Sequence, residues 1–170
     1  MKNKLSLAFL MTLPLAIMFF ISWYVGLFSE VDEKEIRFPT RILLLRSYQG
    51  EYLNGAKLIQ EMQKEFLQQN KSCRPILMLL GDDRKVHKLH LRNKAGCICE
   101  GNCPTLKAEQ IVLKEGTFRV IAIKAHPVYA LAKILRYLRQ QSGELMLPLI
   151  MESRGSREHW IYSISSSIQK

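Results

Sequence analysis

Apolar and polar positions divide this chain into one long apolar segment and a longer segment of mixed character. The run from Leu5 to Phe28 carries no charged side chain. About 20 helical residues cross the roughly 30 Å hydrocarbon core of a bilayer. A membrane helix tolerates an internal proline such as Pro14, and it commonly places aromatic residues such as Trp23 and Tyr24 at the interface. The pattern predicts a transmembrane helix.

A cleaved signal peptide is the alternative interpretation of this segment. Lys2 and Lys4 supply the positive start that such a peptide needs. The apolar run is longer than the usual ~7–15 residues, however, and no clean Ala-x-Ala cleavage site follows it. We therefore expect residues 1–29 to remain as a membrane anchor in contact with lipid. Basic residues flank both ends of the run, so the positive-inside rule does not fix the orientation. Because short basic N-terminal tails usually stay in the cytoplasm, we expect an exported domain on an inner or plasma membrane.

The remaining chain alternates between strand-like runs and two segments with helical spacing. Residues 30–37 are mostly charged and are expected to form a stalk. Apolar residues recur at helical spacing over Tyr52–Gln69 and again from Pro127 to Leu138. Short apolar or alternating runs predict strands at residues 41–46, 76–80, 87–92, 95–100, 109–114, 118–124, 147–152 and 160–164.

The order strand, helix, strand, strand occurs twice between residues 38 and 164. Pro75 and Pro148 each stand at the start of the strand that follows a helix. Two such copies indicate a duplication rather than a solenoid. Helices gathered on one side of a mainly antiparallel sheet define an α+β fold, and the cleft between two copies is a favoured place for a ligand. Residues 165–170 form a polar tail.

Composition adds a strongly positive charge. The chain has 25 basic and 15 acidic residues, for a net charge of +10. Such a surface suits anionic neighbours, among them lipid head groups, nucleic acid and envelope polymers. The sequence contains no run of five basic residues, no zinc-finger spacing and no aromatic-basic RNA-binding pattern. We therefore expect no specific nucleic-acid partner.

Three of the four cysteines, Cys97, Cys99 and Cys103, lie close together, whereas Cys73 is remote. On a strand, Cys97 and Cys99 point to the same face. In an exported chain, either of them could form a disulfide with Cys103, but spacing alone does not determine the pairing. Free buried thiols remain an alternative. A zinc site that adds the two nearby histidines is a further one, although its spacing is not a standard zinc pattern and we expect no metal.

Several short motifs follow one another in a recognisable order. They are Tyr48-Gln-Gly50-Glu-Tyr52, Pro75 to Asp83, Ala95-Gly96-Cys97, and Phe118 to Ile164 with Leu147-Pro148 and Glu152. Their order resembles that of the GyrI-like small-molecule-binding domains, which serve as effector domains of multidrug-sensing regulators and form a gyrase-inhibitor protein. The resemblance covers nearly all of residues 38–164. The second half departs from the family pattern, because His126-Pro-Val-Tyr129 replaces the Gly-x-Tyr turn.

The resemblance implies a binding site built on a buried acidic residue among aromatic side chains. Glu152 matches the acidic position, and Tyr48, Tyr129, Trp160 and Tyr162 are the aromatic candidates. A carboxylate in an apolar cleft is unfavourable unless it is paired, and a cationic ligand can pair it while aromatic faces add cation–π attraction. The alternative is that Glu152 lies on the surface at a strand end and that the aromatics belong to the core.

These features favour a membrane-anchored module that binds a small apolar or cationic molecule between its two repeats, without a cofactor. A protein-interaction domain that holds an envelope protein is the alternative. Some GyrI-like relatives are hydrolases that use a pocket glutamate, so Glu152 as a general base is a third hypothesis. The sequence shows neither a G-x-S-x-G motif nor a Cys–His arrangement. A non-enzymatic role is therefore expected.

Overall fold

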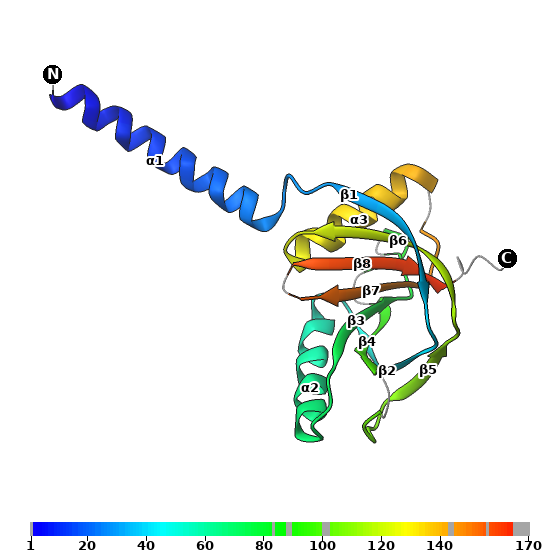
Figure 1. The fold of residues 1–170 in the computed structure, drawn as a ribbon. Coiled ribbons are helices and arrows are strands. Elements are labelled where there is room, and N and C mark those ends of the chain that lie inside the picture. The colour runs from blue at the N-terminus through cyan, green and yellow to red at the C-terminus, as the bar shows by residue number, and fades with distance from the viewer. Residues whose placement is uncertain are drawn as a thin grey trace.

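The computed structural model describes residues 2–82, 84–87, 90–99, 103–142, 145–155 and 157–164. Within these residues, eight strands form one antiparallel sheet, and three helices accompany it (Figure 1). The elements are α1 (Lys2–Val25), β1 (Val31–Phe38), β2 (Arg41–Gln49), α2 (Asn54–Gln68), β3 (Arg74–Leu79), β4 (Arg92–Cys99), β5 (Glu109–Leu113), β6 (Gly116–Lys124), α3 (Pro127–Ser142), β7 (Leu149–Arg154) and β8 (Glu158–Ser163).

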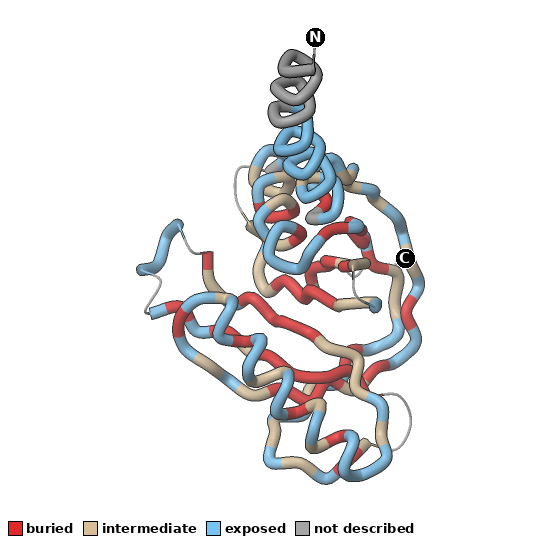
Figure 2. Tube along the Cα trace, turned by 90° about the vertical axis from the view of Figure 1, so that its left-hand side faces the viewer, coloured by how far each residue is buried: buried red, intermediate tan, exposed pale blue. Residues whose placement is uncertain are grey.

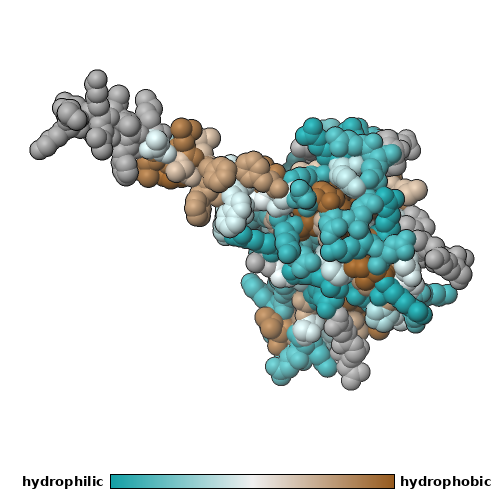
Figure 3. Space-filling view, turned by 45° about the horizontal axis from the view of Figure 1, so that its top comes forward, coloured by the Kyte–Doolittle hydropathy of each residue, from teal (hydrophilic) through white to brown (hydrophobic). Residues whose placement is uncertain are grey.

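Helix α1 projects away from the sheet, and apolar side chains gather along its described part (Figures 1 and 3). Leu15 and Phe20, for example, are 66% and 69% exposed. Among the described residues, no helix is both long enough and apolar enough to cross a membrane. The side chains of residues 5–11, part of the predicted span from Leu5 to Phe28, lie outside the description. The structure therefore gives the predicted transmembrane anchor no support.

Residues 30–37 form most of strand β1 rather than the expected stalk. β1 pairs with β6 along its whole length. Its charged side chains are compatible with a strand because they make ion pairs at the surface, as when Arg119 of β6 donates to Glu33 at 2.6 Å. The strand ends at Phe38, which is buried. An edge strand rich in charge is a known way to discourage pairing with another chain.

The structure has the predicted α+β fold, and the order strand, helix, strand, strand occurs twice in its sheet. Its strand order is β1-β6-β8-β7-β3-β4-β2-β5, and every pairing is antiparallel. One repeat is β2-α2-β3-β4 and the other is β6-α3-β7-β8, while β5 and β1 extend their edges. The strand expected at residues 87–92 is not found where the chain is described: residues 84–86 form a turn, 88 and 89 lie outside the description, and β4 begins only at Arg92.

Two short links curl this sheet. Residues 39–40 join β1 to β2, and residues 114–115 join β5 to β6, although each link connects strands from opposite halves of the strand order. A link of this length spans only about 10 Å, so the two ends of the sheet must approach each other. The enclosed face is filled by apolar side chains, including Phe38, whose ring centroid lies 5.1 Å from that of Tyr162 and 5.5 Å from that of Phe118.

Helices α2 and α3 cover the opposite face, each over its own repeat. α2 packs on β2, β3 and β4 through the fully buried Met62 and Phe66. α3 packs on β6 and β8 and buries Ala130, Ile134 and Leu135. Figure 2 shows buried residues concentrated in the strands and exposed residues along the outer faces of the helices. Because each helix stays on its own repeat, the β3–β7 seam between the repeats is left for other contacts.

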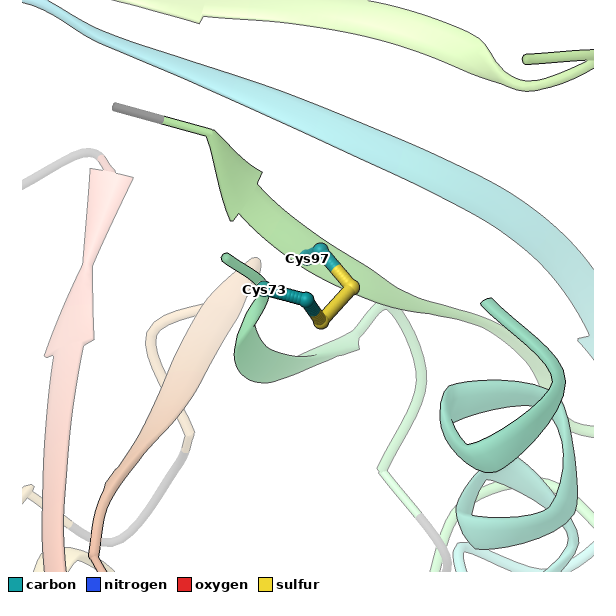
Figure 4. Close-up of a disulfide and its surroundings, with 2 residues drawn as sticks. All are labelled: Cys73 and Cys97. Carbon is teal, nitrogen blue, oxygen red and sulfur yellow. A yellow bond between two sulfur atoms is a disulfide. The ribbon is translucent and has the colours of Figure 1, made fainter. Parts of the chain in front are cut away.

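Two disulfides join the four cysteines, so no described cysteine is free. Cys99 bonds to Cys103, one of the expected pairings, but Cys97 bonds to Cys73 (Figure 4). Cys73 is remote only in sequence, because β3 pairs with β4 and brings its Cα to 5.2 Å from that of Cys97. Spacing alone left the pairing open and did not indicate a bond between Cys73 and Cys97, since strand register decides this contact.

We expect the replacement Gly96→Ala to destabilise the fold by about 3 kcal/mol, because overpacking a rigid site has costs of this order. A Cβ on Gly96 would lie 1.9 Å from the carbonyl oxygen of Leu44, so strand β4 would have to move away from β2. Gly155→Ala is the control, because nothing lies within 4 Å of its Cβ position. Its positive φ of 79° should alone lower stability by only about 1 kcal/mol. Denaturant unfolding followed by circular dichroism measures both, and an equal or smaller loss for Gly96→Ala would contradict the packing described.

Candidate functional site

A cavity of about 310 Å³ lies over the seam between the two repeats; we call it the seam cavity. Its walls come from the first turns of α2 and α3 and the residues just before them, and its floor comes from β3 and β7. Most lining side chains are apolar. They are Glu51, Tyr52, Leu53, Ala56, Ile59, Pro75, Ile76, Leu77, Leu91, Pro127, Val128, Leu131, Ala132, Leu135, Met151 and Ser153.

Small residues on the two helices explain why the seam cavity is open. At Gly55, α2 approaches the sheet so closely that a Cβ would lie 2.7 Å from Cδ1 of Leu77. Close contact at this point ties the helix to its own repeat. Ala56 on α2 and Ala132 on α3 line the cavity from its two sides. Their methyl groups are small and leave the space between the helices unfilled. Both repeats thus contribute to one apolar slot.

Few polar groups border the seam cavity. The Tyr52 hydroxyl donates to the carbonyl oxygen of Gly81 at 3.0 Å and is thereby turned to a local partner. Glu51 is the lining carboxylate, and its residue is exposed. Ser153 contributes a hydroxyl at the end of β7. Lining of this kind, apolar with a few fixed polar groups, is typical of small-molecule sites.

Ser153 is held by a fully buried histidine on the neighbouring strand. His159 Nε2 lies 3.1 Å from the carbonyl oxygen of Ala125, which can only accept, so Nε2 carries the proton. In the neutral ring, Nδ1 then accepts from the Ser153 hydroxyl at 3.1 Å. Burial lowers the pKa of His159 from its ordinary value of 6.5, which keeps the ring neutral and preserves this arrangement.

This lowered pKa predicts a loss of stability in mild acid. As pH falls from about 7 to 5, the His159 imidazole of the unfolded chain takes up a proton that the folded chain resists, so the free energy of unfolding decreases. Replacing His159 by Gln removes the proton uptake and should flatten this part of the stability–pH curve. His90→Gln is the control, because this exposed residue is not among the groups that shift the pKa of His159, so the contribution of His159 to the slope should persist. Denaturant unfolding across this range measures the slopes, and a wild-type slope in His159→Gln would refute the assignment.

Glu152 lies on the face of the sheet opposite the seam cavity. Along β7, Met151 and Ser153 line the cavity, whereas Ile150 and Glu152 alternate with them and point to the enclosed face. The carboxylate is fully buried and accepts from three guanidinium groups, those of Arg41 at 3.0 Å, Arg74 at 3.1 Å and Arg154 at 2.8 Å. It is therefore neither a surface residue nor a group that a ligand in the cavity would meet.

The structure does not bring the four predicted aromatic residues together. Trp160 lies under the guanidinium of Arg154, 3.4 Å from its ring centroid, and Tyr162 is buried on the enclosed face. Tyr48 packs on the helix-covered face near Gly55, and Tyr129 of α3 is 44% exposed. None of the four lines the seam cavity. The apolar helix residues that do line it recur at the helical spacing of any packed helix face. For this reason the sequence alone did not identify them as site residues.

No described set of three or more His, Cys, Asp or Glu side chains could hold a metal ion. The seam cavity likewise offers no cluster of charged groups for a cofactor. Its chemistry is that of apolar burial, with Ser153 and Tyr52 as fixed polar points at its border.

No protein-family model and no curated protein matches this sequence. Solved structures resemble it at low identity. The structure of an EcmrR–DNA complex in EcmrR-RPo matches with a TM-score of 0.55 and 13% identity over 95% of this chain and 66% of that chain. The EcmrR C-terminal domain matches with a TM-score of 0.51 and 11% identity, over 79% of this chain and 96% of that chain. The structure of SAV2435 bound to tetraphenylphosphonium matches with a TM-score of 0.52 and 11% identity. This match covers 77% of this chain and 92% of the SAV2435 chain.

These likenesses show the fold and fit the GyrI-like domains that the sequence resembles. Two of the three cover nearly the whole of the other chain and more than three quarters of this one. This chain spans about two thirds of the EcmrR chain in the DNA complex.

Proposed function

We propose that this domain binds a small, predominantly apolar molecule in the seam cavity. The observation that carries the proposal is the open, apolar slot of about 310 Å³ between α2 and α3, to which both repeats contribute. Ligand sites commonly have volumes of this order and are lined mainly by apolar side chains. An open seam favours ligand binding over the protein-interaction alternative, for which a packed seam would have been expected.

Burial of apolar surface would supply most of the affinity. A ligand that removes about 250 Å² of apolar surface from water gains roughly 6 kcal/mol before the cost of association, which is enough for weak to moderate binding. The likeness to SAV2435, which was solved with tetraphenylphosphonium, supports small-molecule binding by a domain of this fold. Glu152 faces away from the slot, so the proposal rests on apolar contacts rather than on a buried carboxylate.

Filling the slot should weaken binding. Ala132→Trp on α3, or Ala56→Trp on α2, projects an indole into the seam cavity and should weaken binding of the neutral fluorescent probe N-phenyl-1-naphthylamine by about tenfold or more. Gln140→Trp is the control, because this exposed α3 residue lies outside the cavity lining. Fluorescence titration measures the dissociation constant, with thermal melts to verify folding. Undiminished affinity in both folded cavity variants, or no probe binding by the wild type, would refute the proposal.

We also propose that the folded domain resides in an oxidising compartment, in keeping with the expected export. Disulfides persist outside the reducing cytosol, and two of them close here within one small domain. Cys97 is fully buried, so its bond to Cys73 is shielded from reductants. This shielding favours a structural rather than a transient role for that disulfide.

Thiol labelling in intact cells that produce the chain tests the compartment. Cells are quenched in acid, and the denatured protein is treated with a maleimide of high mass before and after reduction. We expect no labelling before reduction and four added masses afterwards, because all four cysteines are paired. The double variant Cys99→Ser, Cys103→Ser should add two masses, and again only after reduction. Labelling of the unreduced protein would show a reducing compartment.

A further inference from the structure

The proton of the Ser153 hydroxyl is already used within the protein. Ser153 and His159 stand opposite each other in the β7–β8 pairing, and Ser153 Oγ lies 3.1 Å from His159 Nδ1. His159 Nε2 donates to the carbonyl oxygen of Ala125, so Nδ1 of the neutral ring can only accept. The Ser153 hydroxyl is therefore the donor to Nδ1. Its oxygen keeps lone pairs, but no proton, for a further partner.

Of these two residues, only Ser153 is open to the seam cavity. His159 is fully buried, whereas Ser153 is partly exposed and lines the cavity. A ligand in the cavity thus meets the serine side chain and not the imidazole. Burial also lowers the pKa of His159, which keeps the ring neutral. The direction of the hydrogen bond from Ser153 to His159 therefore holds at neutral pH.

The other two polar side chains of the cavity lining are acceptors as well. The Tyr52 hydroxyl gives its proton to the carbonyl oxygen of Gly81 at 3.0 Å and has no second proton to donate. The ionised carboxylate of Glu51 carries no proton at all. The remaining lining side chains are apolar, apart from Ser153 itself. Among the described residues that line the cavity, no side chain therefore has a proton to offer a ligand.

This arrangement of protons favours one kind of polar group on a ligand. A molecule that covers Ser153 removes the serine oxygen from water, and an acceptor that is buried without a donor is unfavourable. A hydroxyl or N–H group on the ligand restores the lost hydrogen bond. An ether or carbonyl oxygen instead brings two acceptors together. A formal charge would lose its hydration in an apolar slot, so the complementary ligand is uncharged.

We propose that the ligand is an uncharged apolar molecule with a hydroxyl or N–H group, which donates a hydrogen bond to Ser153 Oγ. This inference rests on the proposed function, because the apolar body of the ligand occupies the seam cavity. Ser153 is then the residue that selects the polar end of the ligand. Alcohols, phenols and indole-type N–H compounds share the required chemistry, whereas their O-methyl and N-methyl derivatives lack it.

Pairs of compounds that differ only in the donor test this proposal. 2-Naphthol and 2-methoxynaphthalene form the O–H pair, and 2-phenylindole and 1-methyl-2-phenylindole form the N–H pair. Displacement of N-phenyl-1-naphthylamine measures each dissociation constant, corrected for the affinity of the probe. We expect the donor of a pair to bind wild-type protein about fivefold more tightly than its methylated partner. Burial of the added methyl group alone would favour the methylated compound, so the expected order is the reverse of the hydrophobic one.

A substitution at Ser153 links the preference to the serine oxygen. In Ser153→Val, a methyl group takes the place of the hydroxyl and covers His159 Nδ1, so a ligand cannot reach the ring in its stead. This variant should lose the preference for the donor compounds. Ser47→Val is the matched control, because this exposed serine of β2 lies outside the cavity lining. It should keep the wild-type preference, and thermal melts verify that both variants fold.

The outcomes distinguish this inference from the proposed function. A preference in one pair only identifies an O–H or an N–H ligand. Equal or weaker binding of both donors by the wild type overturns the inference and leaves the proposed function intact, as does a preference that persists in folded Ser153→Val. If the probe binds but none of the four compounds displaces it, the inference fails as well. If the wild type does not bind the probe, the proposed function itself fails. The wild-type comparison decides where Ser153→Val does not fold.

Discussion

The antiparallel pairing of β3 with β7 is the contact on which the rest of this structure depends. It joins the two repeats into one sheet, with Leu77 opposite Met151 and Met78 opposite Ile150. Because side chains alternate along a strand, Leu77 and Met151 form the floor of the seam cavity while Met78 and Ile150 enter the enclosed core. Each helix packs on the strands of its own repeat. The apolar side chains along the β3–β7 pairing are therefore left uncovered and form the floor of the slot.

Much of the fold could be predicted from local pattern, and the exceptions have physical causes. Both amphipathic helices and the order of strands around them follow from spacing, because each element buries one face. β1 escaped prediction because an edge strand with ion-paired side chains, such as Glu33, carries little apolar signal. The Cys73–Cys97 bond also escaped, since it depends on the register of β3 against β4, a contact between strands that no local pattern encodes.

The site was harder to predict than the fold. Ala56 on α2 and Leu131 on α3 each belong to an apolar series with ordinary helical spacing, which any packed helix shows. They become cavity walls only because the two helices lie apart from each other. Glu152 stood out in the sequence as an acid in an apolar strand, but its environment depends on which face of β7 it occupies. A shift of one residue along the strand would have placed it in the slot. Its three arginine partners come from β2, β3 and β7 itself, and such a cluster exists only after the sheet has formed.

The buried Glu152 links the two faces of the sheet in one physical arrangement. A lone carboxylate in this core would be strongly unfavourable, and one arginine would suffice to neutralise it. Three arginines converge on it instead, and two of them, Arg74 and Arg154, reach the rim of the sheet, where their side chains are 31% and 29% exposed. Removing the carboxylate would leave these guanidinium groups without their shared anchor. Glu152 is thus a structural group of the enclosed face, because it fixes the positions of guanidinium groups from three strands.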